Sequence, residues 1–235
     1  MKALVNKIKD LFFPPRCALC DDVLDIKEKN VCEKCEKNIG YIKGPICYKC
    51  GRPVKEGEEY CFDCKKENHV FNAGRFPLSY EYIGDSLFRF KYNNRPEYAD
   101  FYAKCSVKRY GEWIEGLKAQ ALVPVPLNKK RFAKRGYNQA EEYCKALSLL
   151  TGIPMYADIV KRVRDTKPQK IFDKKGRRQN VKKAFNVTEN VVKLNTIILV
   201  DDIFTTGSTI DALSEEFRNK GVKNIYFITV SGAGT

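Results

Sequence analysis

Apolar runs that suit strands alternate with helical apolar patterns through the second half of the chain. Residues 121–126 and 196–200 are short continuous apolar runs, which predict buried parallel strands. Helical spacing predicts helices over residues 139–150 and 208–220, and residues 222–230 predict a last strand. Strands that alternate with helices in this way predict a parallel α/β sheet.

Residues 76–120 are predicted to form the first elements of the same domain. We expect a strand at residues 78–82, a short helix at 86–92 and a longer helix at 97–110. The apolar positions that we expect in the core of this region are Leu87, Phe88, Phe90, Tyr98, Phe101, Tyr102 and Cys105.

Polar residues gather where the strand 196–200 is predicted to end. Two carboxylates come first, and a glycine among four hydroxyl-bearing residues then precedes the helix. Ligands of open α/β sheets bind at the carboxyl ends of strands, and a helix N-terminus with hydroxyl donors suits a phosphate. The carboxylates suit sugar hydroxyls or a magnesium shell one step away. The predicted ligand is therefore a phosphorylated sugar, and its candidate residues are Asp201, Asp202, Thr205, Thr206, Gly207, Ser208 and Thr209.

Two alternatives bear on this stretch. It is not a P-loop, because the sequence has no G-x-x-x-x-G-K-[ST]. An ordinary strand, turn and capped helix, with Ser208 or Thr206 as N-cap, is the plainer interpretation. A cap needs one such residue and not a cluster, so we favour the ligand site.

Basic residues follow the strand 121–126 and fill residues 161–183. Five cations lie within residues 129–135, just before the helix 139–150, and predict a second anion site. Residues 161–183 contain 11 basic and two acidic side chains. A nucleic-acid-binding or merely solvated surface is the alternative for both stretches.

Eight of the ten cysteines form four C-x-x-C pairs. Two pairs make one four-thiolate zinc (Zn2+) site, so the spacing predicts two structural zinc sites. Disulfides lack the support of a secretory signal, and four redox pairs without a βαβ frame are unusual. Sequential and cross-braced pairing both fit, and we favour the sequential one. The predicted ligands are Cys17, Cys20, Cys32, Cys35, Cys47, Cys50, Cys61 and Cys64.

The other cysteines and the single histidine are expected outside these sites. Cys105 and Cys144 are expected to be buried in helices. The two cysteine sets are already complete, so His69 is expected at the surface.

Charge and hydropathy limit the class of protein. The net charge is +14, of which +13 lies in residues 65–235, and this favours an anionic partner. No apolar run is long enough to span a membrane, and residues 1–13 lack the features of a signal peptide. Those residues predict an amphipathic helix with apolar positions Leu4, Ile8, Leu11 and Phe12. We favour a helix that packs on the protein, and a helix on a membrane surface is the alternative.

Two motifs resemble known families. Residues 200–209 resemble the phosphoribosyl pyrophosphate (PRPP) motif of type I phosphoribosyltransferases. The stretch V-P-V-P-L-x-K-K-R-x-x-K-R-G-Y-N-Q is similar to the signature of the ComF family of competence proteins, ComFC-like. This resemblance implies a type I phosphoribosyltransferase-like α/β fold with a small N-terminal, Cys-rich double zinc ribbon. The implied organisation is an N-terminal helix (1–16), the ribbon (17–64), a linker (65–75) and the larger domain (76–235).

The resemblance also implies a role for each motif. Asp201 and Asp202 would hold the ribose hydroxyls, and residues 205–209 would wrap the 5′-phosphate. Magnesium (Mg2+) would accompany PRPP. A basic loop and a flexible loop would face the pyrophosphate, with Lys130, Arg131, Arg135, Arg164, Thr166, Gln169 and Arg178 as the matching residues.

Two functions follow from the resemblance. The first is an enzyme that transfers phosphoribose from PRPP to an acceptor that the sequence does not name. The second is a non-catalytic, PRPP-responsive protein that binds single-stranded DNA during natural transformation. In both, the implied partners are PRPP, single-stranded DNA and a DNA-uptake helicase of the ComFA type, and the location that the resemblance implies is the cytoplasm.

Overall fold

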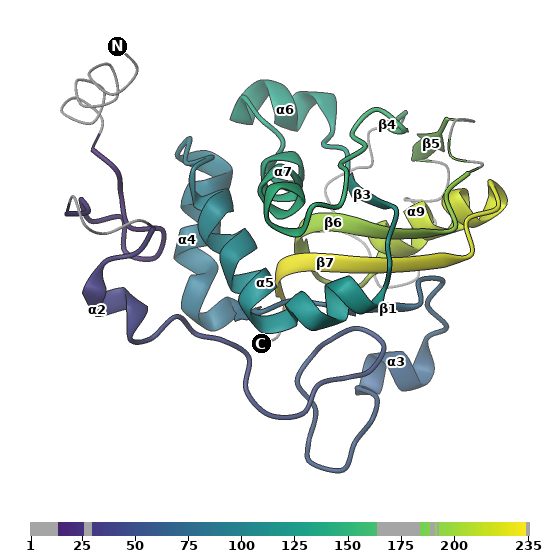
Figure 1. The fold of residues 1–235 in the computed structure, drawn as a ribbon, viewed down its shortest axis with the longest axis horizontal. Helices are drawn as coiled ribbons and strands as arrows, with labels where there is room; N and C mark the ends of the chain where they lie inside the picture. The colour runs from purple at the N-terminus through teal and green to yellow at the C-terminus, as the bar shows by residue number, and fades with distance from the viewer. Residues whose placement is uncertain (1–13, 26–29, 164–183, 189–190, 192, 234–235) are drawn as a thin grey trace.

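A parallel β-sheet forms the centre of the computed structural model, which describes residues 14–25, 30–163, 184–188, 191 and 193–233 (Figure 1). The strand order is β1-β7-β6-β3, and β2 also pairs with β7. All four pairings are parallel, which confirms the predicted sheet. The strands are β1 (Ala73–Arg75), β2 (Leu78–Ser79), β3 (Ala121–Pro124), β6 (Thr196–Phe204) and β7 (Asn224–Gly232). Residues 73–75, at the end of the expected linker, are thus part of the sheet.

Helices cover both faces of the sheet, because the side chains of β6 alternate between two cores. Ile198 and Val200 pack with α4 (Tyr80–Tyr92), α5 (Tyr98–Gly116) and α7 (Gln139–Thr151). Ile197 and Leu199 pack on the other face with α9 (Ser208–Asn219) and with a small antiparallel sheet, β4 (Val160–Arg162) with β5 (Phe185–Val187).

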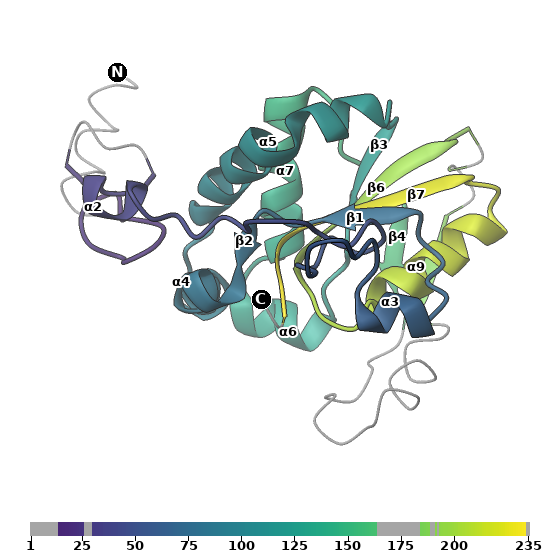
Figure 2. The same ribbon diagram turned by 90° about the horizontal axis from the view of Figure 1, so that it is seen from below.

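Two cysteine-rich segments lie at separate places on this frame. The first ribbon, residues 17–35 with helix α2 (Glu33–Glu36), lies beside α4 and α5, whereas the second ribbon, residues 47–64 with helix α3 (Phe62–Lys66), lies by β1 and α9 (Figure 2). The amide of Gly74 in β1 donates a hydrogen bond to the carbonyl of Lys49 in the second ribbon, at 2.8 Å.

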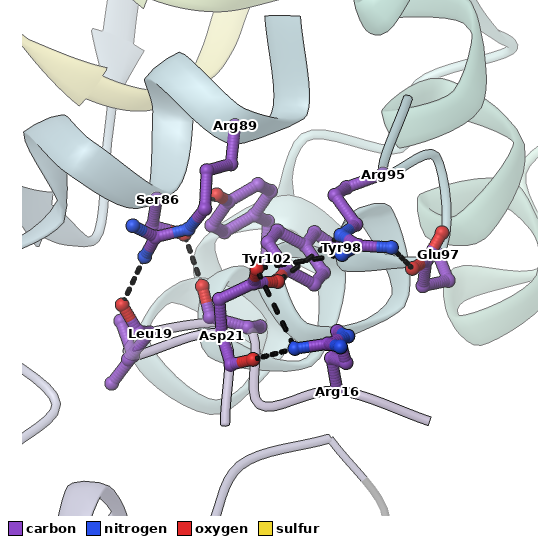
Figure 3. A network of polar contacts seen from close by, with 10 residues as sticks. Arg16, Leu19, Asp21, Ser86, Arg89, Arg95, Glu97, Tyr98 and Tyr102 are labelled. Carbon is purple, nitrogen blue, oxygen red and sulfur yellow. Dashed lines mark hydrogen bonds and ion pairs between the residues drawn. The ribbon is translucent and has the colours of Figure 1, made fainter. Parts of the chain in front are cut away.

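Asp21 fastens the first ribbon to the helices (Figure 3). Its carboxylate accepts hydrogen bonds from Tyr98 and from Arg95, whose Nε lies 3.1 Å away. Partial burial raises the pKa of Asp21, but these two donors outweigh it and hold that pKa below its usual value. Arg95 thus holds the first ribbon against the helices.

Three expectations about α4 and the basic loop are wrong. The strand predicted at 78–82 ends at Ser79, because Ile83, Leu87 and Phe90 bury one face of a helix that begins at Tyr80. Phe88, expected in the core, is 58% exposed on the opposite face of that helix. The basic stretch forms a short helix, α6 (Lys129–Arg135), because Asn128 caps its N-terminus and a left-handed Gly136 ends it.

The other core predictions hold. The expected core positions of α5 are buried, as are Cys105 and Cys144. No helix among residues 14–25, 30–163, 184–188, 191 and 193–233 combines the length and apolar character that crossing a membrane requires. The helix expected within residues 1–16 falls almost wholly outside the described residues.

Candidate functional site

The eight C-x-x-C cysteines form two compact clusters. Cys17, Cys20, Cys32 and Cys35 make one cluster, and Cys47, Cys50, Cys61 and Cys64 make the other; within each, the sulfur atoms lie within 4.8 Å of one another. Neighbouring sulfurs of a tetrahedral zinc–thiolate site lie about 3.8 Å apart. The Cys20–Cys32 and Cys50–Cys61 sulfur distances are 3.8 and 3.6 Å. Both clusters therefore fit structural zinc, and the pairing is sequential.

Six of the predicted ligand residues of the larger domain line a cleft at the carboxyl ends of β3 and β6. The cleft has a volume of about 240 Å3 and is mostly polar. The residues that line it include Lys91, Arg131, Arg135, Arg162, Asp201, Asp202, Thr205 and Thr209. Two segments that lie about 70 residues apart in the chain thus converge because β3 and β6 are neighbours in the sheet.

The two carboxyl groups at the end of β6 have different surroundings. Lys91 on α4 places its Nζ 3.0 Å from Asp202 Oδ2, in an ion pair that is largely buried. The amide of Asp202 donates to Asp201 Oδ1 at 2.8 Å. Burial raises the pKa of Asp201 to about 7, and the neighbouring charge of Asp202 adds to that rise. Nothing around Lys91 in the sequence indicates this partner, because α4 lies more than 100 residues before β6.

Residues 205–209 join β6 to α9 and divide between two sides. Thr205 and Thr209 line the cleft. The hydroxyls of Thr206 and Ser208 lie 2.5 Å apart and bond to each other. The N-cap of α9 is Gly207, at φ +78°, and no side chain caps the helix. The plainer interpretation, with Ser208 or Thr206 as N-cap, is therefore wrong.

The predicted pyrophosphate residues separate into three groups. Arg131 and Arg135 line the cleft, and Arg135 Nη1 donates to Gln139 Oε1 at 2.7 Å. Lys130 is exposed on α6 and is not among the cleft-lining residues named for the described part of the chain. The remaining four, Arg164, Thr166, Gln169 and Arg178, lie outside the described residues.

His69 is not at the surface as expected. Its side chain is 3% exposed, and its Nδ1 lies 2.8 Å from Asp211 Oδ2 in the first turn of α9. The expectation failed because nothing within residues 65–75 indicates a partner 142 positions later in the chain.

Two family profiles match this chain. The double zinc ribbon domain matches residues 8–65, and the phosphoribosyl transferase domain matches residues 135–234. Competence protein F of Haemophilus influenzae is 34% identical over 225 residues, which cover 91% of this chain and 95% of that protein. Competence protein ComFC of Bacillus subtilis is 27% identical, with 83% and 80% covered. DNA utilization protein YhgH of Escherichia coli is 26% identical, with 90% and 94% covered.

These matches agree with the geometry. The predicted fold class is confirmed, since a phosphoribosyltransferase domain with a parallel sheet follows two four-cysteine clusters. The match to Competence protein F extends over both parts. This chain, a double zinc ribbon followed by a phosphoribosyltransferase domain, therefore belongs to the ComF family of competence proteins.

Proposed function

We propose that the phosphoribosyltransferase domain binds PRPP with Mg2+ and that the protein acts in the cytoplasm, in DNA uptake during natural transformation. One observation carries PRPP binding: a carboxylate pair, a hydroxyl-bearing helix start and two arginines converge on one polar cleft. The names of the relatives, two competence proteins and a DNA utilization protein, support the role in DNA uptake. We also propose a DNA-uptake helicase of the ComFA type as a partner.

Each part of PRPP has a matching group in the cleft. Asp201 and Asp202 are placed to accept hydrogen bonds from ribose hydroxyls, in exchange for the ion pair that Asp202 makes with Lys91. Residues 205–209 and the N-terminus of α9 suit the 5′-phosphate. Arg131 and Arg135 supply positive charge for the pyrophosphate. Carboxylate and phosphate oxygens are ligands that Mg2+ prefers, and the bound ion would neutralise part of the charge of the pyrophosphate.

The reaction that this arrangement supports is a displacement at the anomeric carbon. The bond from that carbon to the pyrophosphate oxygen breaks, and pyrophosphate leaves with the bonding electrons. A nitrogen of the acceptor forms the new bond and loses a proton to solvent. Arg131 and Arg135 stabilise the negative charge that grows on the leaving group.

Calorimetry of the zinc-loaded protein tests PRPP binding. PRPP with Mg2+ is titrated into the wild type, the double variant Asp201→Ala/Asp202→Ala and the matched control Glu215→Ala/Glu216→Ala, which loses the same charge on α9. We expect binding to the wild type and the control, and none to the first variant. Absence of binding to the wild type contradicts the proposal. A parallel pyrophosphate assay with candidate acceptors separates turnover from binding alone.

A strip of aromatic and basic side chains favours single-stranded DNA as a second ligand. Phe88 and Tyr92 lie on the exposed face of α4 with ring centroids 5.0 Å apart. Arg135 of α6 lies over the Tyr92 ring at 4.8 Å, and Phe132, one turn before it, is 48% exposed. Exposed rings beside cations are typical of surfaces that stack bases and follow a phosphate backbone. We call these four residues the aromatic strip.

Single-strand binding at two salt concentrations tests the strip. We expect Phe88→Ala/Phe132→Ala to weaken binding about tenfold or more, because stacking contributes about 1–3 kcal/mol per base. Phe62→Ala, which removes an exposed ring from the second ribbon, serves as control. Affinity should fall steeply with salt, and less steeply once charges in residues 161–183 are removed. Equal binding by the strip variant and the wild type contradicts this surface.

A further inference from the structure

We propose that Arg52 and His69 are positioning residues that hold residues 205–209 in their ligand-binding conformation, so that the second zinc ribbon is a working part of the PRPP site. The inference rests on the proposed function. It assigns to the site a set of supporting residues on the side of residues 205–209 that faces away from the cleft. The cleft side of this segment faces the ligand, and the opposite side contacts the second ribbon and the residues that follow it.

Arg52 joins the second ribbon to the segment directly. It follows Cys50 by two residues, and its Nη1 donates to Asp63 Oδ2 at 2.6 Å, next to Cys64. Its Nη2 donates to the carbonyl oxygen of Thr205. The guanidinium also lies over the Phe204 ring, 5.5 Å from its centroid. One side chain thus ties a metal-binding knuckle to the first residue of the 205–209 segment.

His69 supports the next turn of the same segment. Asp211 is buried in the first turn of α9, and it accepts hydrogen bonds from His69 Nδ1 and from the amide of Val70, each at 2.8 Å. The imidazole ring lies against Gly207, where an added Cβ would come within 3.0 Å of the ring. The left-handed Gly207 is therefore covered by a ring that is itself fixed to α9.

A chain of packed aromatic rings connects His69 to the central sheet. The His69 ring stacks on Phe71 at 4.7 Å, and Phe71 meets Phe204 edge to face at 6.1 Å. Phe204 stacks on Phe227 of the sheet at 4.6 Å. The space left between the second ribbon, His69, Phe204 and Thr206 is about 10 Å3, at most the size of one water molecule. A shift of the ribbon is therefore transmitted to the segment, because no solvent layer separates them.

Preorganisation explains why this contact matters for affinity. A phosphate is bound well when donors are already in place, since ordering a loop at the moment of binding costs free energy. Residues 205–209 hold a left-handed glycine and no side-chain helix cap, so their own sequence fixes them only partly. Arg52 and His69 supply the missing constraint from outside the sheet domain.

The experiment compares two anchors with a matched anchor of the first ribbon. PRPP with Mg2+ is titrated by calorimetry into zinc-loaded wild type, Arg52→Gln, Arg52→Lys, His69→Ala and Arg95→Gln, the last of which loosens the first ribbon instead. Amide hydrogen exchange of residues 205–211 is measured without ligand, and zinc content is measured for each variant.

We expect two zinc ions per chain in every variant, five- to tenfold weaker PRPP binding in Arg52→Gln and His69→Ala, and faster exchange of residues 205–211 in both. Arg52→Lys should recover part of the loss, and Arg95→Gln should bind within twofold of the wild type. Unchanged affinity and exchange in Arg52→Gln and His69→Ala would overturn the inference. If the wild type itself binds no PRPP, the proposed function fails, and the exchange rates alone then decide the positioning role.

Discussion

The two zinc ribbons use the same cysteine spacing but have different neighbours. The first ribbon is fastened by Asp21 to Arg95 and Tyr98, at one end of the molecule (Figure 3). The second ribbon contacts β1 and the start of α9, next to the candidate PRPP site (Figure 2). The same metal chemistry therefore has two different neighbours: the first ribbon packs on the outer helices, and the second contacts the segment that we propose binds the 5′-phosphate of PRPP.

A C-x-x-C motif predicts a metal site, but the role of that site depends on where the folded ribbon lies. A C-x-x-C pair is local, so its sequence predicts a metal site wherever it occurs. Its functional consequence depends on which part of the domain the folded ribbon touches. Each prediction below changes one ribbon, or one side of residues 205–209, and measures whether PRPP affinity or stability changes.

Loss of one zinc site should give the largest difference. Cys64→Ser and Cys35→Ser each remove the last ligand of a cluster, and both ligands are partly buried. Each variant should retain about one zinc ion per chain. PRPP affinity should fall more than tenfold in Cys64→Ser and less than twofold in Cys35→Ser, by calorimetry, with circular dichroism confirming a folded sheet domain. An equal loss in both would remove the distinction between the ribbons.

Gly207 tests the ribbon side of the segment through stability. Gly207→Ala introduces a Cβ at φ +78° and 3.0 Å from the His69 ring, whereas Gly136→Ala introduces one at φ +82° with no atom within 4 Å. The control should lose about 1 kcal/mol of unfolding free energy from backbone strain alone. Gly207→Ala should lose about 2–3 kcal/mol, because the ring must also move. Urea unfolding measures both, and equal losses would mean that the ring does not press on Gly207.

The sequence predicted what is local and missed what comes from distant segments. The hydroxyl cluster after β6 and the cysteine pairs are encoded within about ten residues each, and they appear where expected, whereas β6 continues to Phe204, four residues past its predicted end. Lys91, Arg52 and His69 reach the site from positions more than 100 residues earlier in the chain, so no pattern around them indicates a partner. Phe88 was assigned to the core because aromatic residues usually lie there, whereas α4 presents it to solvent.

The anchor of the first ribbon should have a smaller effect that stays local. Asp21 has φ +66°, a conformation that asparagine also tolerates, so Asp21→Asn removes charge with little backbone strain. Weaker bonds from Tyr98 and Arg95 should cost about 1–2 kcal/mol of unfolding free energy and speed amide exchange in residues 17–25. PRPP affinity should not change. Asp100→Asn, at an exposed position of α5, controls for the lost charge.

Removing the charge of Asp201 should give the smallest change in unfolding free energy, and it should raise stability where the other variants lower it, because this carboxyl group lies in the cleft and not on the ribbon side of residues 205–209. On the ribbon side, Arg52 and Asp211 have close partners. On the cleft side, burial and Asp202 raise the pKa of Asp201 to about 7, above its ordinary value. A raised pKa in the folded state means that stability is lost as pH rises through that pKa.

Wild-type stability should therefore fall between pH 6 and pH 8 by about 1 kcal/mol more than that of Asp201→Asn, which has no charge to bury at this position. Thermal and urea unfolding across this range, where zinc stays bound, measure the difference. PRPP binding should be lost in the same variant, because the amide is a poorer acceptor for ribose hydroxyls. A parallel pH dependence in the two proteins would show that Asp201 is not held in a state of unfavourable charge.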